Sequence, residues 1–134
     1  MLQKIDHIGI AVKDLNASIK MYEQLLGVAC FKIETVATEK VVTAFFQLNG
    51  IKIELIAASE QDSTISNFIE KRGEGLHHIA FQVADIKLES DRLRADEFHL
   101  IYEEVKSGAD NKLINFIKPS LTGKVLVELC VDKS

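Results

Sequence analysis

Apolar and polar positions change their spacing along the first part of the chain. Apolar residues occupy every second position across 8–12, which is the periodicity of a β-strand. They then recur every three or four positions across 15–26, which is helical spacing. Asp14 before this stretch and Gly27 after it are typical residues for the start and the end of a helix. The pattern predicts a strand followed by a helix.

Two further strands are predicted after this helix. The residues 42–48 and 51–55 are rich in β-branched and aromatic side chains, and Asn49-Gly50 separates them. Asn-Gly between two such stretches is a strong indication of a tight β-hairpin. A short additional strand fits near 31–36, so the first half of the chain reads β-α-β-β with space for one more strand.

The second half of the chain repeats this order of strands and helix. The segment Asp6–Leu15 returns as His77–Ile86, and the strand Ile51–Leu55 returns as Val125–Leu129. The second half also predicts a helix, from Asp85 to about Arg94. A repeat of this length, present in two copies, indicates duplication of one supersecondary unit rather than a solenoid, which needs more copies.

The repeat predicts one domain over residues 1–134. Its first module covers about 1–58 and its second about 75–132. Between them, residues 62–73 predict a connecting helix, because Ile65, Phe68 and Ile69 lie on one helical face and Gly73 ends it.

Composition narrows the possible functions. The 134 residues carry a net charge of -4 without a basic run, which argues against an electrostatic nucleic-acid binder. No apolar stretch reaches the length of a membrane span, and the N-terminus does not read as a signal peptide. We therefore expect a cytoplasmic protein. Cys30 and Cys130 lie in apolar surroundings without metal-site spacing, and we expect both to be reduced.

The alternation of side chains along the strands predicts on which face of the sheet the candidate metal ligands lie. If the apolar residues of each strand face the helices, then His7, Glu54, His78 and Glu128 face the opposite side of the sheet. Small residues beside them, such as Gly9, Ala11 and Ala80, are expected to leave space. Imidazole and carboxylate groups together are good ligands for a divalent transition metal.

A single histidine or glutamate in a strand is more often structural than a ligand. The candidate set is stronger because it recurs at matching places in both copies. His77 has the opposite side-chain parity to His78, so we expect it not to bind a metal. His99 has no counterpart in the first half, and we expect it at the surface.

The chain resembles the vicinal oxygen chelate superfamily (glyoxalase, bleomycin resistance and dioxygenase proteins), and within it the methylmalonyl-CoA epimerases. The segments that carry the resemblance are Ile5–Val12, Lys52–Leu55, Glu70–Phe81, Gly108–Lys112 and Gly123–Leu129. The resemblance implies an α+β fold, in which two tandem βαβββ modules form a curved, mostly antiparallel eight-stranded sheet around a metal site.

The same resemblance implies the chemistry. His7, Glu54, His78 and Glu128 correspond to the metal ligands, and the cofactor would be one divalent ion of cobalt, manganese, nickel or zinc. The implied reaction is epimerisation of methylmalonyl-CoA, an acyl-CoA substrate, by removal and return of the α-proton. Glu128 corresponds to a candidate general base. Relatives of this kind often form homodimers, and a homodimer is expected here.

Three residues are candidates for binding substrate. Lys112 is a possible contact for a phosphate or carboxylate, and Thr43 and Asn115 occupy matching places in the two copies. Thr43 stands where some relatives carry a second carboxylate, so the second proton carrier of an epimerase is unassigned. A glycine that is common in the family after the second helix is replaced near Glu97.

Other functions use the same scaffold. A glyoxalase I-like lactoylglutathione lyase would act on a glutathione hemithioacetal with the same four ligands. A ring-cleaving dioxygenase would hold Fe(II) through three ligands, one fewer than this chain offers. A metal-free binding or resistance protein would not require the paired His and Glu residues.

Overall fold

The computed structural model describes residues 1–134, which form eight strands and three helices. The strands are β1 (Leu2–Ala11), β2 (Lys32–Val36), β3 (Val41–Leu48), β4 (Ile51–Ala58), β5 (Gly75–Val83), β6 (Lys106–Gly108), β7 (Lys112–Ile117) and β8 (Val127–Asp132). The helices are α1 (Leu15–Leu26), α2 (Thr64–Arg72) and α3 (Ile86–Ala95), with short 3₁₀ turns η1 (Ala37–Glu39) and η2 (Pro119–Leu121).

The strands follow one another in the hydrogen-bonded order β2-β3-β4-β1-β5-β8-β7-β6. The pairs β2–β3, β3–β4, β7–β8 and β6–β7 are antiparallel, whereas β5 and β8 are parallel. The predicted α+β class, its eight strands and its largely antiparallel pairing are confirmed.

The chain forms two compact units. One consists of Ile8–His77, and the other joins Met1–His7 to His78–Ser134. The boundary falls inside β1 and inside β5, so the first residues of the chain pack with its second half. Each unit is described below by itself.

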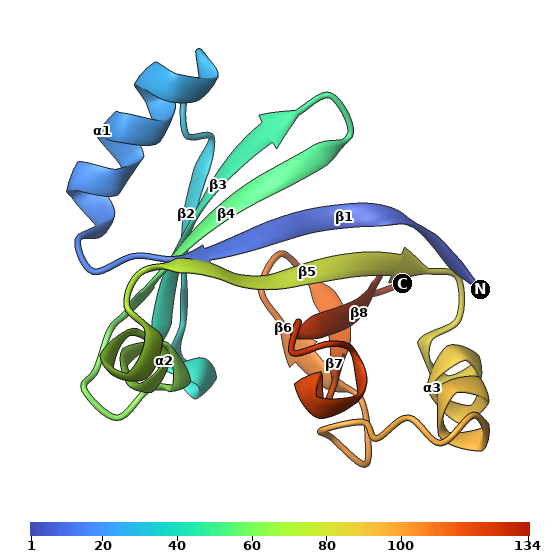
Figure 1. Ribbon diagram of the computed structural model, residues 1–134. Coiled ribbons are helices and arrows are strands. Elements are labelled where there is room, and N and C mark those ends of the chain that lie inside the picture. Colours follow the sequence, from blue (N-terminus) through green and yellow to red (C-terminus); the bar gives the residue numbers. More distant parts are fainter. The chain divides into compact units, whose positions relative to one another are not determined.

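In the unit Ile8–His77, α1 contacts β4 and covers one face of β2, β3 and β4 (Figure 1). The helix begins where the Asp14 side chain accepts a hydrogen bond from the Ala17 N–H, and it ends at Gly27 with a φ of 71°. Asn49 and Gly50 both have positive φ in the turn between β3 and β4, as a tight hairpin requires. The buried residues beneath α1 are Val12, Ala44, Phe46, Leu55 and Ala57.

The helix α2 covers a second cluster in the same unit. Ile65 of α2 packs with Ala11, Val41 and Ile56. Val12 and Ala11 therefore face different clusters, as the alternation of β1 predicts. The small Ala11 does not leave open space, contrary to expectation, because α2 side chains fill the volume beside it.

In the unit containing His78–Ser134, α3 packs against β7 and β8 (Figure 1). The core on this side consists of Val83, Ile86, Leu93, Ile117 and Leu129. On the opposite side, Ala80, Ile114 and Cys130 are buried together with Phe116 packed against them. Like Ala11, Ala80 is covered by larger side chains rather than bordering empty space. No helix of the chain is long and apolar enough to cross a membrane.

Candidate metal centre

His7 lies on β1 and is buried, with 5% of its surface exposed. Its Nδ1 is 2.8 Å from Oδ2 of the neighbouring Asp6, which is also buried. An ionised carboxylate can only accept a hydrogen bond, so with Asp6 ionised the His7 tautomer that fits this contact has its proton on Nδ1. The lone pair of the neutral ring is then on Nε2, the nitrogen that faces away from Asp6.

The Nε2 of His7 meets two further candidate ligands. It is 3.0 Å from Nε2 of His78 and 3.5 Å from Oε2 of Glu128. The other carboxylate oxygen of Glu128 lies 3.4 Å from Nε2 of His78. His78 comes from β5 and Glu128 from β8, which lie side by side because these strands pair in parallel. The structure thus brings together three of the four predicted ligands, all of them buried.

The spacing of these three groups fits a single divalent ion. Imidazole nitrogens and carboxylate oxygens bind such ions at about 2.0–2.2 Å, which separates adjacent ligand atoms by about 3.0–3.5 Å. The two Nε2 atoms, 3.0 Å apart, lie in this range, and so does the distance from each of them to its nearer Glu128 oxygen, 3.5 Å to Oε2 for His7 and 3.4 Å to Oε1 for His78. The Nε2 atoms of both histidines and the carboxylate of Glu128 face one another. The donor set of His7, His78 and Glu128 therefore suits a metal.

A second group of potential ligands consists of Asp6, His7 and Cys130. It uses the other nitrogen of His7, which already donates its proton to Asp6. The ammonium group of Lys112 is 3.5 Å from Oδ1 of Asp6 and supplies a positive charge there. This side of His7 is better described as a hydrogen-bonded ion pair than as a metal site.

Lys112 is buried and holds two carboxylates. Its Nζ lies 2.5 Å from Oδ1 of Asp132 as well as 3.5 Å from Asp6. Burial disfavours the charged form, but the hydrogen bond to Asp132 and the negative charges of Asp6 and Asp132 outweigh it and raise the pKa of Lys112. The ammonium group thus lies between the buried Asp6 and the exposed Asp132, and its role as a substrate contact stays a prediction.

Asn115 has no exposed surface and binds backbone. Its Oδ1 accepts hydrogen bonds from the N–H groups of Tyr102 and Phe116, and its Nδ2 donates to the carbonyl of Tyr102. The structure thus places this predicted cavity residue on β7, where its side chain binds the connection before β6. Its involvement with substrate also stays a prediction.

Glu54 and Thr43 belong to the unit Ile8–His77. Glu54 is buried on β4 opposite Phe45, and Thr43 is buried on β3 between Glu34 and Ile56. Residues directly opposite each other share a face of the sheet, so Glu54 and Thr43 lie on the same face. This is the face away from α1, as the alternation predicts, because Ile53 and Leu55 pack on the α1 side.

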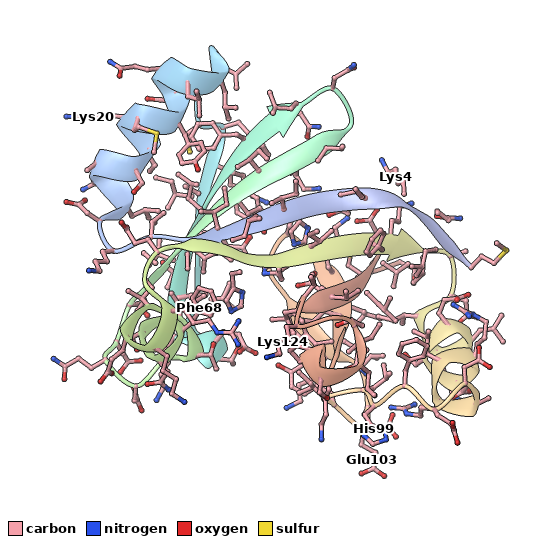
Figure 2. All side chains as sticks on the ribbon, in the orientation of Figure 1. Lys4, Lys20, Phe68, His99, Glu103 and Lys124 are labelled. Carbon is pink, nitrogen blue, oxygen red and sulfur yellow. The ribbon has the colours of Figure 1, made fainter.

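The remaining histidines have separate surroundings. The ring of His77 packs edge-on against Phe68 of α2, with 4.9 Å between the ring centres. Burial lowers the pKa of His77 to about 4, so it is neutral at pH 7. Figure 2 shows Phe68 on α2 and His99 on the connection that follows α3. His99 is exposed, as expected.

Two contacts near His7 were not predicted from the sequence, namely its hydrogen bond to Asp6 and the ion pair of Asp6 with Lys112. Asp6 precedes His7 directly, and this adjacency is a usable signal because histidine ligands usually donate their second N–H to a carboxylate. The contact between Lys112 and Asp6 has no local signal, since it depends on how distant strands pair.

Comparison with known proteins shows the family of the chain. Residues 6–116 match the family model of the glyoxalase/bleomycin resistance protein/dioxygenase superfamily. The chain belongs to this superfamily. It is 42% identical to the uncharacterised protein YqjC of Bacillus subtilis over 98% of this chain and 94% of that protein. It is 33% identical to the human mitochondrial methylmalonyl-CoA epimerase over 96% of this chain and 73% of that protein.

A solved structure of the same superfamily is also similar. The crystal structure of methylmalonyl-CoA epimerase from Mycobacterium tuberculosis superposes with a TM-score of 0.94 at 34% identity, over 99% of this chain and 90% of that chain. The resemblance to the superfamily and to its methylmalonyl-CoA epimerases, noted from the sequence, is therefore confirmed.

Proposed function

We propose that this protein is a metal-dependent methylmalonyl-CoA epimerase. The observation that carries the proposal is the convergence of His7, His78 and Glu128 at 3.0–3.5 Å in a chain similar to epimerases of that name. The substrate is then an acyl-CoA, and the reaction inverts the configuration of its α-carbon.

His7, His78 and Glu128 would hold one divalent ion, which we propose to be cobalt, manganese, nickel or zinc. Glu54, buried on the face of its sheet away from α1, is the proposed fourth ligand, from its correspondence to the family's ligand positions. A bound ion would supply Lewis-acid stabilisation of the negative charge that develops on the substrate's carbonyl oxygen, on the order of several kcal/mol.

Glu128 is the proposed general base. Both its oxygens lie within 3.5 Å of a histidine Nε2, which orients the carboxylate toward the proposed centre. A positioned base contributes roughly 10²–10⁴-fold to a proton transfer. Thr43 is buried and has a hydroxyl, which cannot act as a general base at neutral pH. The second proton carrier must therefore be another group.

Proton exchange tests the proposal. Purified, Co²⁺-loaded protein is incubated with one epimer of methylmalonyl-CoA in D₂O, and deuterium at the α-carbon is followed together with the configuration. The expected result is deuterium incorporation with formation of the other epimer. No exchange by the folded, metal-loaded protein would contradict the proposed activity.

Glu128→Gln is the matched variant, because it keeps the size of the side chain and removes its basicity. We expect it to abolish exchange. Glu60→Gln, at an exposed residue after β4, is the control and should exchange at the wild-type rate. Undiminished exchange in a folded, metal-bound Glu128→Gln protein would remove Glu128 from the role of base.

A further inference from the structure

A line of charged side chains runs from the candidate metal centre to the surface, where it ends at the exposed Asp132. Asp132 contacts Lys112, Lys112 contacts Asp6, and Asp6 accepts the Nδ1 proton of His7. Lys112 and Asp6 are 7% and 4% exposed, which is unusual for charged residues. Burying such groups is costly unless each is paired, so an arrangement of this kind calls for an explanation.

We propose that Asp6 and Lys112 are positioning residues for His7, and that they fix its ring orientation and its tautomer so that Nε2 presents its lone pair to the metal. The proposal rests on the metal site of the proposed function. It assigns Lys112 to the interior of the protein rather than to a substrate anion.

The role of Asp6 follows from hydrogen-bond chemistry. A neutral imidazole has one proton and can place it on either nitrogen. A proton on Nε2 would block metal binding, whereas the carboxylate 2.8 Å from Nδ1 stabilises the proton there. Partners that hold the second nitrogen of a histidine ligand typically contribute 10–100-fold to metal affinity.

Lys112 acts on the other oxygen of the same carboxylate. Oδ2 of Asp6 binds His7, and Oδ1 faces the ammonium group at 3.5 Å. With one oxygen on each partner, the carboxylate has a single favourable orientation. Asp132 holds Lys112 in turn, at 2.5 Å.

Net charge offers a competing explanation, since the negative Asp6 would attract a cation without any positioning. The two explanations predict different behaviour for the double variant Asp6→Leu/Lys112→Met. This variant removes one negative and one positive charge, so the local net charge is unchanged while the orientation of His7 is lost.

The first measurement is the tautomer of His7 in metal-free protein, read from the ¹⁵N shifts of its two ring nitrogens. Wild type is expected to carry the proton on Nδ1, and Asp6→Leu to shift it mainly to Nε2. Lys112→Met should speed solvent exchange of the Nδ1 proton, and Lys112→Arg should restore slow exchange. Lys106→Met, at an exposed lysine of β6, is the control and should change nothing.

The second measurement is Co²⁺ affinity by calorimetry. Asp6→Leu should raise the Kd about 10–100-fold, and the double variant should stay as weak. Asp6→Asn, which keeps a neutral acceptor oxygen, should lose less. If Asp6→Leu does not fold, Asp6→Asn decides through the Nδ1 proton resonance, which should move upfield as the hydrogen bond weakens.

Three results would overturn the proposal. They are a Nδ1-protonated His7 in folded Asp6→Leu protein, a Co²⁺ affinity of that variant within twofold of wild type, and recovery of wild-type affinity in the double variant. The tautomer is measured without metal or substrate. Failure of wild-type protein to bind Co²⁺ or to exchange the α-proton would instead count against the proposed function.

Discussion

Asn115 shows how a single side chain can hold a connection in place. It binds both the N–H and the carbonyl of Tyr102, in the way that a neighbouring β-strand would. The Tyr102 ring then packs edge-on against Phe116, and Phe116 packs edge-on against His78. One buried amide therefore connects the conformation of this segment to the surroundings of a candidate metal ligand.

Asn115→Ala is expected to lower the free energy of unfolding by about 1–3 kcal/mol, because the part-buried backbone N–H and carbonyl of Tyr102 lose their hydrogen-bond partner. Urea denaturation measures this loss, and hydrogen exchange should show faster exchange at the Tyr102 amide. Asn67→Ala, at an exposed position of α2, is the control. A loss below 0.5 kcal/mol, on the order of a surface substitution, would contradict the interpretation.

For single residues, the sequence predicted the positions of the candidate metal ligands better than it predicted the contacts of the residues around them. Alternation along β1, β5 and β8 was enough to place His7, His78 and Glu128 on one side of their strands. The partners of Lys112 and Asn115 were not predictable, since each lies on a different segment brought near by strand pairing and by the return of the chain after α3. The positive charge of Lys112, and the matching places of Asn115 and Thr43 in the two copies, had suggested ligand contacts instead.

The ends of several helices and strands are set by the conformations of one or two residues. Asp14 begins α1, Gly27 ends it, and Asn49-Gly50 forms the turn of the hairpin. All of these were predictable from the sequence, because each depends on interactions with residues close by in the chain. The end of α3 differs. Glu97 follows the helix with a φ of 70°, a left-handed conformation that glycine adopts without strain.

Glu97→Gly is expected to stabilise the protein by about 0.5 kcal/mol. Relief of the left-handed strain contributes about 1–2 kcal/mol, and the greater flexibility of glycine in the unfolded chain offsets about 0.4–1 kcal/mol of it. Thermal or urea unfolding measures the difference. Glu97→Ala removes the same exposed side chain without relieving the backbone, so it should not stabilise; equal stabilisation by both variants would point to the side chain instead.

The two compact units of the molecule do not coincide with the two copies of the sequence repeat. The repeat separates an N-terminal from a C-terminal half, whereas Met1–His7 packs with His78–Ser134. His7 and His78 are 71 positions apart and have their Nε2 atoms 3.0 Å from each other. The sequence could show that the two histidines correspond, but their contact depends on long-range pairing.

Metal binding should stabilise the folded molecule, because the candidate ligands converge only in the native state. At a Co²⁺ concentration one hundred times the Kd, the free energy of unfolding is expected to rise by about 2.7 kcal/mol. Unfolding with and without Co²⁺ measures the increase, and EDTA should reverse it. Glu128→Ala should show little or no increase; an undiminished increase in this variant would place the ion elsewhere.

The division of β1 also sets an order of events during synthesis. His7 emerges from the ribosome long before β5 and β8, the strands that carry its candidate co-ligands. A nascent chain that ends before Val127 has no Glu128 to offer, so it cannot assemble this three-ligand centre even if Ile8–His77 has already collapsed. If the proposed ion binds here, its three-ligand site is complete only after β8 has been synthesised, and a product that ends before Val127 lacks one of the three ligands.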